Sequence, residues 1–127
     1  MPNILIAGLG RFISADPNAA ATFGPQAGNI KLLEEALQKA TEAGYYHLTI
    51  DVDTNNPKES LVAIENELKS KDYDLFVIGY GIRGNRDFTA VFEEVVNLCV
   101  RVSPKTRFGF SPAPGAVFET IQRVLEK

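Results

Sequence analysis

Two glycine-rich segments of the chain carry arginines and could bind an anion. Gly79-Tyr80-Gly81-Ile82-Arg83-Gly84 follows an apolar run, and Arg86 lies two residues beyond it. Gly8-Leu9-Gly10-Arg11 repeats the pattern after the first apolar run. Glycine lets the backbone approach a ligand, and a guanidinium offers several planar donors to phosphate or carboxylate. We therefore expect an anionic small molecule to contact Gly10, Arg11, Gly79, Tyr80, Gly81, Arg83 and Arg86.

The alternative is structural: the glycines form tight turns and the arginines are solvated or paired with nearby carboxylates. For Tyr80, between two glycines, the alternatives are a ring that projects into the site or a ring folded back on the surface.

The segment from Gly79 to Gly84 formally matches the fingerprint G-x-G-x-x-G. In dinucleotide-binding proteins this fingerprint follows the first strand, and an acidic residue about 20 positions later holds the ribose. Here it follows the third predicted strand, and the corresponding later positions, 97–101, fall inside a predicted helix. We therefore reject dinucleotide binding for this segment and retain only anion binding.

Asp51 and Asp53 are the candidate acid/base groups. They occupy alternate positions near the carboxyl end of the second predicted strand, so their side chains share one face. Such a pair could orient a hydroxyl or share Mg²⁺. The alternative is a hydrated strand end followed by an Asx-type turn. No third oxygen ligand stands out in the sequence, so we assign no metal site and leave any cofactor undetermined.

Nucleophilic catalysis has little support. Ser111 follows the fourth predicted strand, but its surroundings lack the second glycine of a nucleophile elbow. His47, the single histidine, begins the second strand and should lie at the opposite end of the sheet, where we expect a structural role. Cys99, the single cysteine, belongs to the apolar face of a helix and excludes an intramolecular disulfide. Whether the protein is an enzyme stays open.

Apolar runs and helical periodicities alternate along the chain and place these residues. We predict four strands, each followed by a helix. Asn29 or Gly28 should begin the first helix, Asn56 and Pro57 the second, and Asp87 the third. This alternation predicts a single α/β domain over residues 1–127, with three α/β/α layers. The predicted strands are 3–8, 47–53, 74–79 and 106–111.

The strand order follows from which strands are apolar on both faces. The first and third strands are continuously apolar, as in central strands, whereas the second and fourth alternate with polar residues, as at sheet edges. With right-handed crossovers this gives a four-stranded parallel sheet of order 2-1-3-4, a Rossmann-like or flavodoxin-like arrangement. Ligands bind such sheets outside the carboxyl ends of the strands, where the strand order reverses. Both glycine-rich segments should therefore face one crevice, with a long loop, 12–28, as its lid.

Composition restricts the function class. The 127 residues, 45% hydrophobic and 23% charged, fit one core. A net charge of −3 without a Lys/Arg cluster argues against nucleic acid or an anionic membrane as partner. No run approaches the ~20 apolar residues of a membrane span, and the first apolar run is too short for a signal peptide. We expect a cytoplasmic protein.

Two functions remain open. The first is binding of a phosphate- or carboxylate-bearing small molecule at the carboxyl end of the sheet, supported by two Gly-x-Gly segments at one switch point. The second is a protein-interaction or homo-oligomeric assembly module without an active site, in which edge strands or an apolar helix face meet another chain. The lack of a complete catalytic constellation keeps the second function open.

Overall fold

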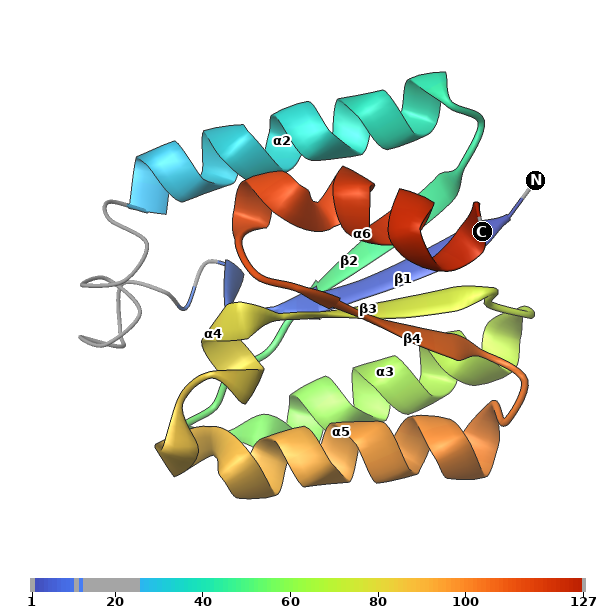
Figure 1. The fold of residues 1–127 in the computed structure, drawn as a ribbon. Helices are drawn as coiled ribbons and strands as arrows, with labels where there is room; N and C mark the ends of the chain where they lie inside the picture. Colours follow the sequence, from blue (N-terminus) through green and yellow to red (C-terminus); the bar gives the residue numbers. More distant parts are fainter. Residues whose placement is uncertain (1, 11, 13–25, 127) are drawn as a thin grey trace.

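A four-stranded, all-parallel sheet forms the centre of the computed structural model, which describes residues 2–10, 12 and 26–126 (Figure 1). The strand order is β2-β1-β3-β4, as predicted. Helices α2 and α6 cover one face of the sheet, and α3 and α5 cover the other, which confirms the α/β/α layering (Figure 1). The strands are β1 (Asn3–Gly8), β2 (Tyr46–Asp51), β3 (Leu75–Gly79) and β4 (Arg107–Ser111). The helices are α2 (Gln26–Glu42), α3 (Pro57–Ser70), α4 (Tyr80–Arg83), α5 (Thr89–Val102) and α6 (Val117–Leu125), with short 3-10 turns η2 (Arg86–Phe88) and η3 (Pro114–Ala116).

The pairing of the strands brings their carboxyl ends to one edge of the sheet. In the register, Gly8 of β1 lies beside Asp51 of β2, and Gly79 of β3 lies beside Ser111 of β4. The apolar side chains of β1 and β3 are buried on both faces, whereas every residue of β2 is half-buried. The continuously apolar strands are therefore the central ones, as the sequence predicts.

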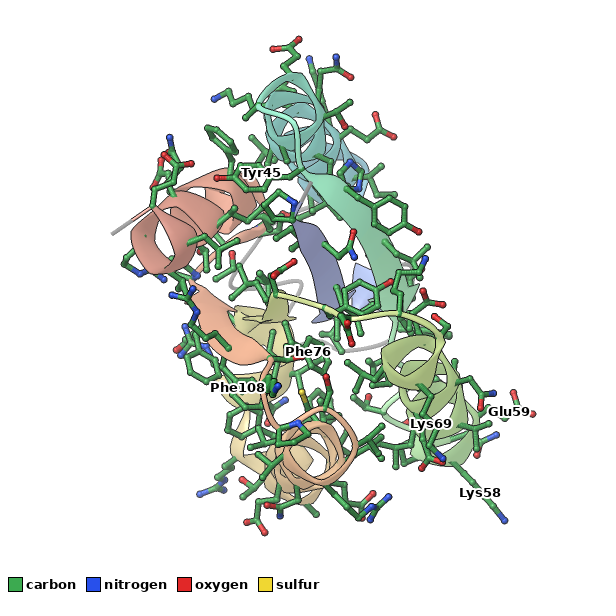
Figure 2. The ribbon with its side chains drawn as sticks, turned by 90° about the vertical axis from the view of Figure 1, so that its right-hand side faces the viewer. Tyr45, Lys58, Glu59, Lys69, Phe76 and Phe108 are labelled. Carbon is green, nitrogen blue, oxygen red and sulfur yellow. The ribbon has the colours of Figure 1, made fainter. Side chains whose placement is uncertain are left out.

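Strand alternation divides the core into two layers. Figure 2 shows Phe76 and Phe108 on the side of the sheet that faces α5, and their rings stack with centroids 6.2 Å apart. Successive side chains of a strand point to opposite faces, so the neighbours of Phe76 face α2 and α6. The α3/α5 layer includes Leu5, Ala7, Phe76, Ile78, Ile64, Val95 and Leu98. The α2/α6 layer includes Ile4, Ile6, Leu75, Val77, Ala36, Ala40, Val117 and Ile121.

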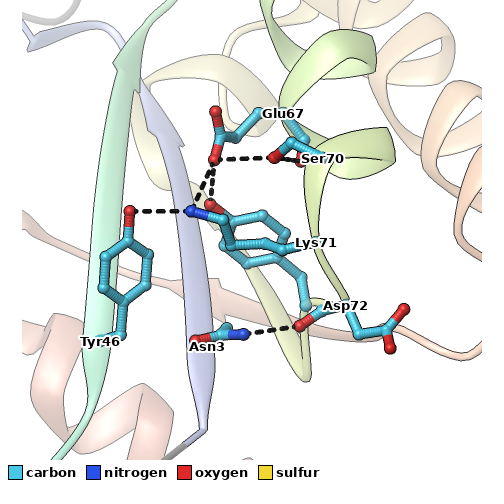
Figure 3. A network of polar contacts seen from close by, with 7 residues as sticks. Asn3, Tyr46, Glu67, Ser70, Lys71 and Asp72 are labelled. Atoms are coloured by element: carbon cyan, nitrogen blue, oxygen red, sulfur yellow. Dashed lines mark hydrogen bonds and ion pairs between the residues drawn. The ribbon is translucent and has the colours of Figure 1, made fainter.

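A polar cluster closes the amino end of the sheet (Figure 3). The hydroxyl of Tyr73, a buried residue, donates a 2.6 Å hydrogen bond to Glu67 Oε1. Lys71 Nζ lies 3.5 Å from the same carboxylate, donates to the Tyr46 hydroxyl at 3.2 Å, and lies 4.5 Å from the centre of the Tyr46 ring. These contacts fasten the end of α3 and the segment before β3 to the edge strand β2.

Helix α2 begins at Gln26, earlier than the predicted start at Gly28 or Asn29. The end of the predicted loop 12–28 is therefore helical, because a single glycine inside a helix costs only about 1 kcal/mol relative to alanine and does not end it. Residues 13–25 of that loop lie outside the described residues. Gly44, with a φ of +91°, follows α2 in the left-handed conformation expected of a helix cap.

Asp87 does not cap the third long helix, contrary to the prediction. The Asn85 side chain accepts a hydrogen bond from the backbone N–H of Asp87 at 2.9 Å and so begins η2. Helix α5 begins only at Thr89. Asn85 and Asp87 are both good capping residues, and the sequence pattern did not show which of them the backbone would use.

Several strand boundaries differ from the predictions by one or two residues. Strand β2 ends at Asp51, so Asp53 lies beyond the strand, and β4 begins at Arg107 instead of residue 106. Asn56 does precede α3 and Pro57 is its first residue, although the Asn56 side chain makes no capping hydrogen bond.

Candidate functional site

The carboxyl ends of the four strands border a crevice of about 80 Å³ that extends between the sheet and the α2/α6 layer. Its inner walls are aliphatic: Ile6 and Val77 come from the central strands, Leu33 from α2 and Val117 from α6. The strand ends and the turns that follow them contribute Gly8, Gly10, Thr49, Asp51, Gly79, Tyr80, Gly81 and Ser111. The two glycine-rich segments therefore border the same crevice.

Gly10 and Asp51 fit closely together at this opening. Gly10 follows β1 with a φ of +50°, in the left-handed region that favours glycine. A Cβ at position 10 would overlap the carboxyl group of Asp51. The backbone N–H of Val52 donates to the Gly8 carbonyl at 2.7 Å and holds the end of β1 against the end of β2. Glycine is thus required here both by its backbone conformation and by the carboxylate beside it.

The predicted arginines lie apart from the described lining of the crevice. The Arg83 guanidinium carbon lies 4.9 Å from the centre of the Tyr80 ring and 5.6 Å from the centre of the Phe110 ring. Its Nε is buried and has no hydrogen-bond partner among the described residues. Arg86 is exposed in η2. Arg11 lies outside the described residues.

The segment after β3 is a short helix, not the open glycine turn that we expected. Gly79 has extended dihedrals, and α4 then runs from Tyr80 to Arg83, closed by a 2.7 Å hydrogen bond from Gly84 N–H to the Tyr80 carbonyl. A Cβ at Gly84 would overlap the Tyr80 ring, so the ring lies over Gly84. Of the two expected orientations, the ring has the folded-back one. Tyr80 still contributes to the lining of the crevice.

Thr49 is a lining residue that our sequence reasoning missed. Its Oγ1 is buried and finds no hydrogen-bond partner within the described part of the chain. Thr49 and Asp51 are two residues apart on β2, and they line both the crevice and a polar groove at the edge of the sheet. Thr49 could have been predicted from the sequence. Side chains alternate along a strand, so the pattern that places Asp51 and Asp53 on one face of the predicted strand places Thr49 on the same face.

Asp53 belongs to this polar groove and not to the described lining of the crevice. Its carboxylate accepts a 3.0 Å hydrogen bond from the backbone N–H of Asn55, and its own N–H donates to Ser60 Oγ at 3.0 Å. The first contact is the Asx-type turn that was the structural alternative for this segment. Asp51 alone of the two carboxylates therefore borders the crevice.

The candidate nucleophile Ser111 and the candidate base His47 are each hydrogen-bonded within the protein and lie at opposite ends of the sheet. Ser111 is buried beside the crevice, and its hydroxyl donates to the Ala113 carbonyl at 2.6 Å. His47 Nε2 shares a 3.0 Å hydrogen bond with Thr41 Oγ1 near the start of β2, at the opposite end of the sheet. Cys99 is buried in the core, and this burial raises the pKa of its thiol to about 11. Ser111 and His47 therefore cannot act together as nucleophile and base.

Within residues 2–10, 12 and 26–126, no three His, Cys, Asp or Glu side chains are grouped so that they could hold a metal ion. The same ranges contain no helix that is long and apolar enough to cross a membrane. Comparisons with protein-family models, with curated proteins and with solved structures found no match.

Proposed function

We propose that the protein binds a small anionic molecule, with phosphate or carboxylate as the anionic group, at the carboxyl end of the sheet. The observation that carries this proposal is the convergence of both glycine-rich segments on one crevice, with Gly10 from the first and Gly79, Tyr80 and Gly81 from the second. Open parallel sheets bind ligands at this edge, beside the point where the strand order reverses. In this sheet that point lies between β1 and β3.

The lining suggests which part of the ligand contacts the inner walls of the crevice and which part contacts its opening. Aliphatic side chains cover the inner walls, so the apolar part of the ligand belongs there. The anionic group belongs at the opening, where Gly10 and Gly81 let a ligand approach the backbone. If the bound molecule reacts, Asp51 is the candidate acid or base, since Asp53 is held in its turn.

The test is a thermal-shift panel of nucleotides, sugar phosphates and carboxylic acids. A ligand present at 100 times its Kd should stabilise the protein by about 2.7 kcal/mol. Gly8 lies on the same face of β1 as Ile4 and Ile6 and borders the crevice. A Cβ added to Gly8 would meet no atom within 4 Å. Gly8→Ala and Gly8→Val should therefore reduce the free space of the crevice without a collision at Cβ. We expect these variants to lose the ligand-induced shift progressively.

Gly28→Ala is the matched control, because a Cβ at Gly28 also meets no atom within 4 Å. Gly28 is an exposed residue of α2 and is not part of the described lining of the crevice. Its ligand-induced shift should equal that of the wild type. A panel without any shift, or a shift that Gly8→Val leaves intact, would sink the proposal.

Assembly through the edge of β4 is the alternative. Phe110 on that edge is 38% exposed, but its carbonyl accepts a 3.0 Å hydrogen bond from Arg123 Nη2 of α6. A side chain on the edge carbonyl obstructs pairing with another strand. Sedimentation velocity over a hundredfold concentration range distinguishes the two functions, because an assembly module should show a concentration-dependent dimer.

A further inference from the structure

The size of the crevice restricts the part of a ligand that can enter it. A volume of about 80 Å³ is small beside the roughly 300–1,000 Å³ of typical ligand pockets. The crevice therefore suits a small aliphatic group, such as propyl, isopropyl or isobutyl, better than a purine, flavin or nicotinamide ring.

The walls match such a chain in chemistry as well as in size. Ile6, Val77 and Val117 are buried aliphatic residues, and half-buried Leu33 of α2 completes the lining. Each methylene group buried against these walls should tighten binding about fourfold.

Two oxygen-bearing side chains of β2, Thr49 and Asp51, lie beside the aliphatic walls. Thr49 Oγ1 is buried without a hydrogen-bond partner among the described residues, an arrangement that proteins rarely tolerate without a reason. Asp51, two residues further along the same face of β2, is the charged residue in the described lining. A carboxylate only accepts hydrogen bonds and has about four acceptor sites, so it can bind a ligand donor in addition to protein donors. The ligand must therefore present an N–H or O–H group next to its aliphatic chain.

We propose that the ligand is a short-chain aliphatic acid with an adjacent donor group, that is, an aliphatic amino acid or 2-hydroxy acid. Its branched chain occupies the crevice, its ammonium or hydroxyl group donates to Asp51, and its chain end or donor group contacts the Thr49 hydroxyl. Its carboxylate is the anionic group of the proposed function, on which this inference rests.

Titration calorimetry with five probes tests the inference. Leucine and 2-hydroxy-4-methylpentanoate carry the chain and the donor, 4-methylpentanoate lacks the donor, and glycine lacks the chain. Adenosine monophosphate carries a purine ring in place of the aliphatic chain. We expect leucine or its hydroxy analogue to bind, 4-methylpentanoate to bind at least tenfold more weakly, and glycine to give no signal. Comparison of the first two probes shows whether the donor is an amine or a hydroxyl.

Asp51→Asn should weaken the probe that binds by at least tenfold, and Thr49→Val by a few-fold. Thr120→Val is the matched control, because Thr120 is fully buried in α6 and its hydroxyl is already bonded to the Ala116 carbonyl at 2.9 Å. Its Kd should be unchanged. Binding of the nucleotide but not of the aliphatic acids would overturn this inference and leave the proposed function standing. Failure of every probe, together with a silent thermal-shift panel, would overturn both.

Discussion

The carboxyl group of Asp51 occupies the space in which residue 10 would carry a Cβ, and Gly10 has a φ of +50°. The two residues come from neighbouring strand ends, β1 and β2, and both border the crevice. The same contact thus determines the shape of the opening and the position of the carboxylate.

Gly10→Ala should destabilise the protein by about 2–4 kcal/mol, because it adds both a strained φ and an overlap with a carboxylate. Urea denaturation measures the loss. Asp51→Ala in the same chain removes the overlap and should restore at least 1 kcal/mol, leaving the cost of the left-handed backbone. Gly28→Ala, in an exposed helical position, should instead gain about 0.5–1 kcal/mol. A loss below 0.5 kcal/mol for Gly10→Ala would contradict the described contact.

Thr49→Val should stabilise the ligand-free protein. A buried hydroxyl with no hydrogen-bond partner among the described residues costs free energy in the folded state, and valine removes it with little change of shape. We expect a gain of about 1 kcal/mol, which is an increase in Tm of roughly 3–5 °C for a chain of this size. Thr120→Val, which breaks a hydrogen bond to a carbonyl, should lower Tm. If Thr49→Val lowers Tm as well, its hydroxyl has a partner in solution.

Tyr73→Phe should make stability less dependent on pH in the acidic range. The hydrogen bond from Tyr73, aided by the nearby Lys71 ammonium, lowers the pKa of Glu67 from its ordinary value of 4.5. The ionised Glu67 therefore stabilises the fold above about pH 4.5, and this contribution is lost as the pH falls through the lower pKa of the folded state. At pH 7 the loss on substitution should be about 1 kcal/mol, and it should shrink toward pH 3.

Tyr45→Phe is the control for this pH series. Tyr45 also donates to a carboxylate at 2.6 Å, but its partner, Glu126, is exposed beyond the end of α6. Exposed contacts of this kind contribute little, so the substitution should cost less than about 0.5 kcal/mol. Equal losses for the two tyrosines would show that the burial of Tyr73 does not matter.

Cys99 should not react with iodoacetamide in the folded protein at pH 8. Burial raises the pKa of the thiol to about 11 and shields it from reagents, so little thiolate forms. In denaturant the single cysteine of the chain should be alkylated completely, as mass spectrometry would show. Alkylation of the folded protein faster than global unfolding would indicate a local opening of α5.

The strand order was predictable because burial determines composition. β1 and β3 are the central strands and have helices on both sides. Because both faces are buried, these strands contain only apolar residues apart from Asn3 and the terminal glycines. This composition distinguishes them from the edge strands. The strand order also predicted which strand ends meet at the crevice. Gly10, Gly79 and Gly81 border the crevice, but only Gly10 of the three has the positive φ that favours glycine.

The side-chain details were less predictable, because they depend on contacts distant in sequence. The stacking of Arg83 between Tyr80 and Phe110 requires the end of β4, which is far along the chain. That Thr49 Oγ1 is buried without a hydrogen-bond partner in the described part of the chain is likewise a property of three-dimensional packing, which the sequence does not indicate. The helical turn at α4 was overlooked because two glycines favour a loop by local propensity, and tertiary packing of the buried Ile82 overrides that propensity.

The parallel order of the sheet also bears on how the chain is synthesised. β1 precedes both of its neighbours, β2 and β3, in the chain, and its second edge stays open until Gly79 has been made. At about 5–20 residues per second this takes several seconds. During that time the apolar segment Ile4-Leu5-Ile6-Ala7 can pair with β2 but lacks β3 on its other edge. A nascent chain arrested before β3 should therefore bind chaperones through its N-terminal strand, and release should coincide with the synthesis of β3.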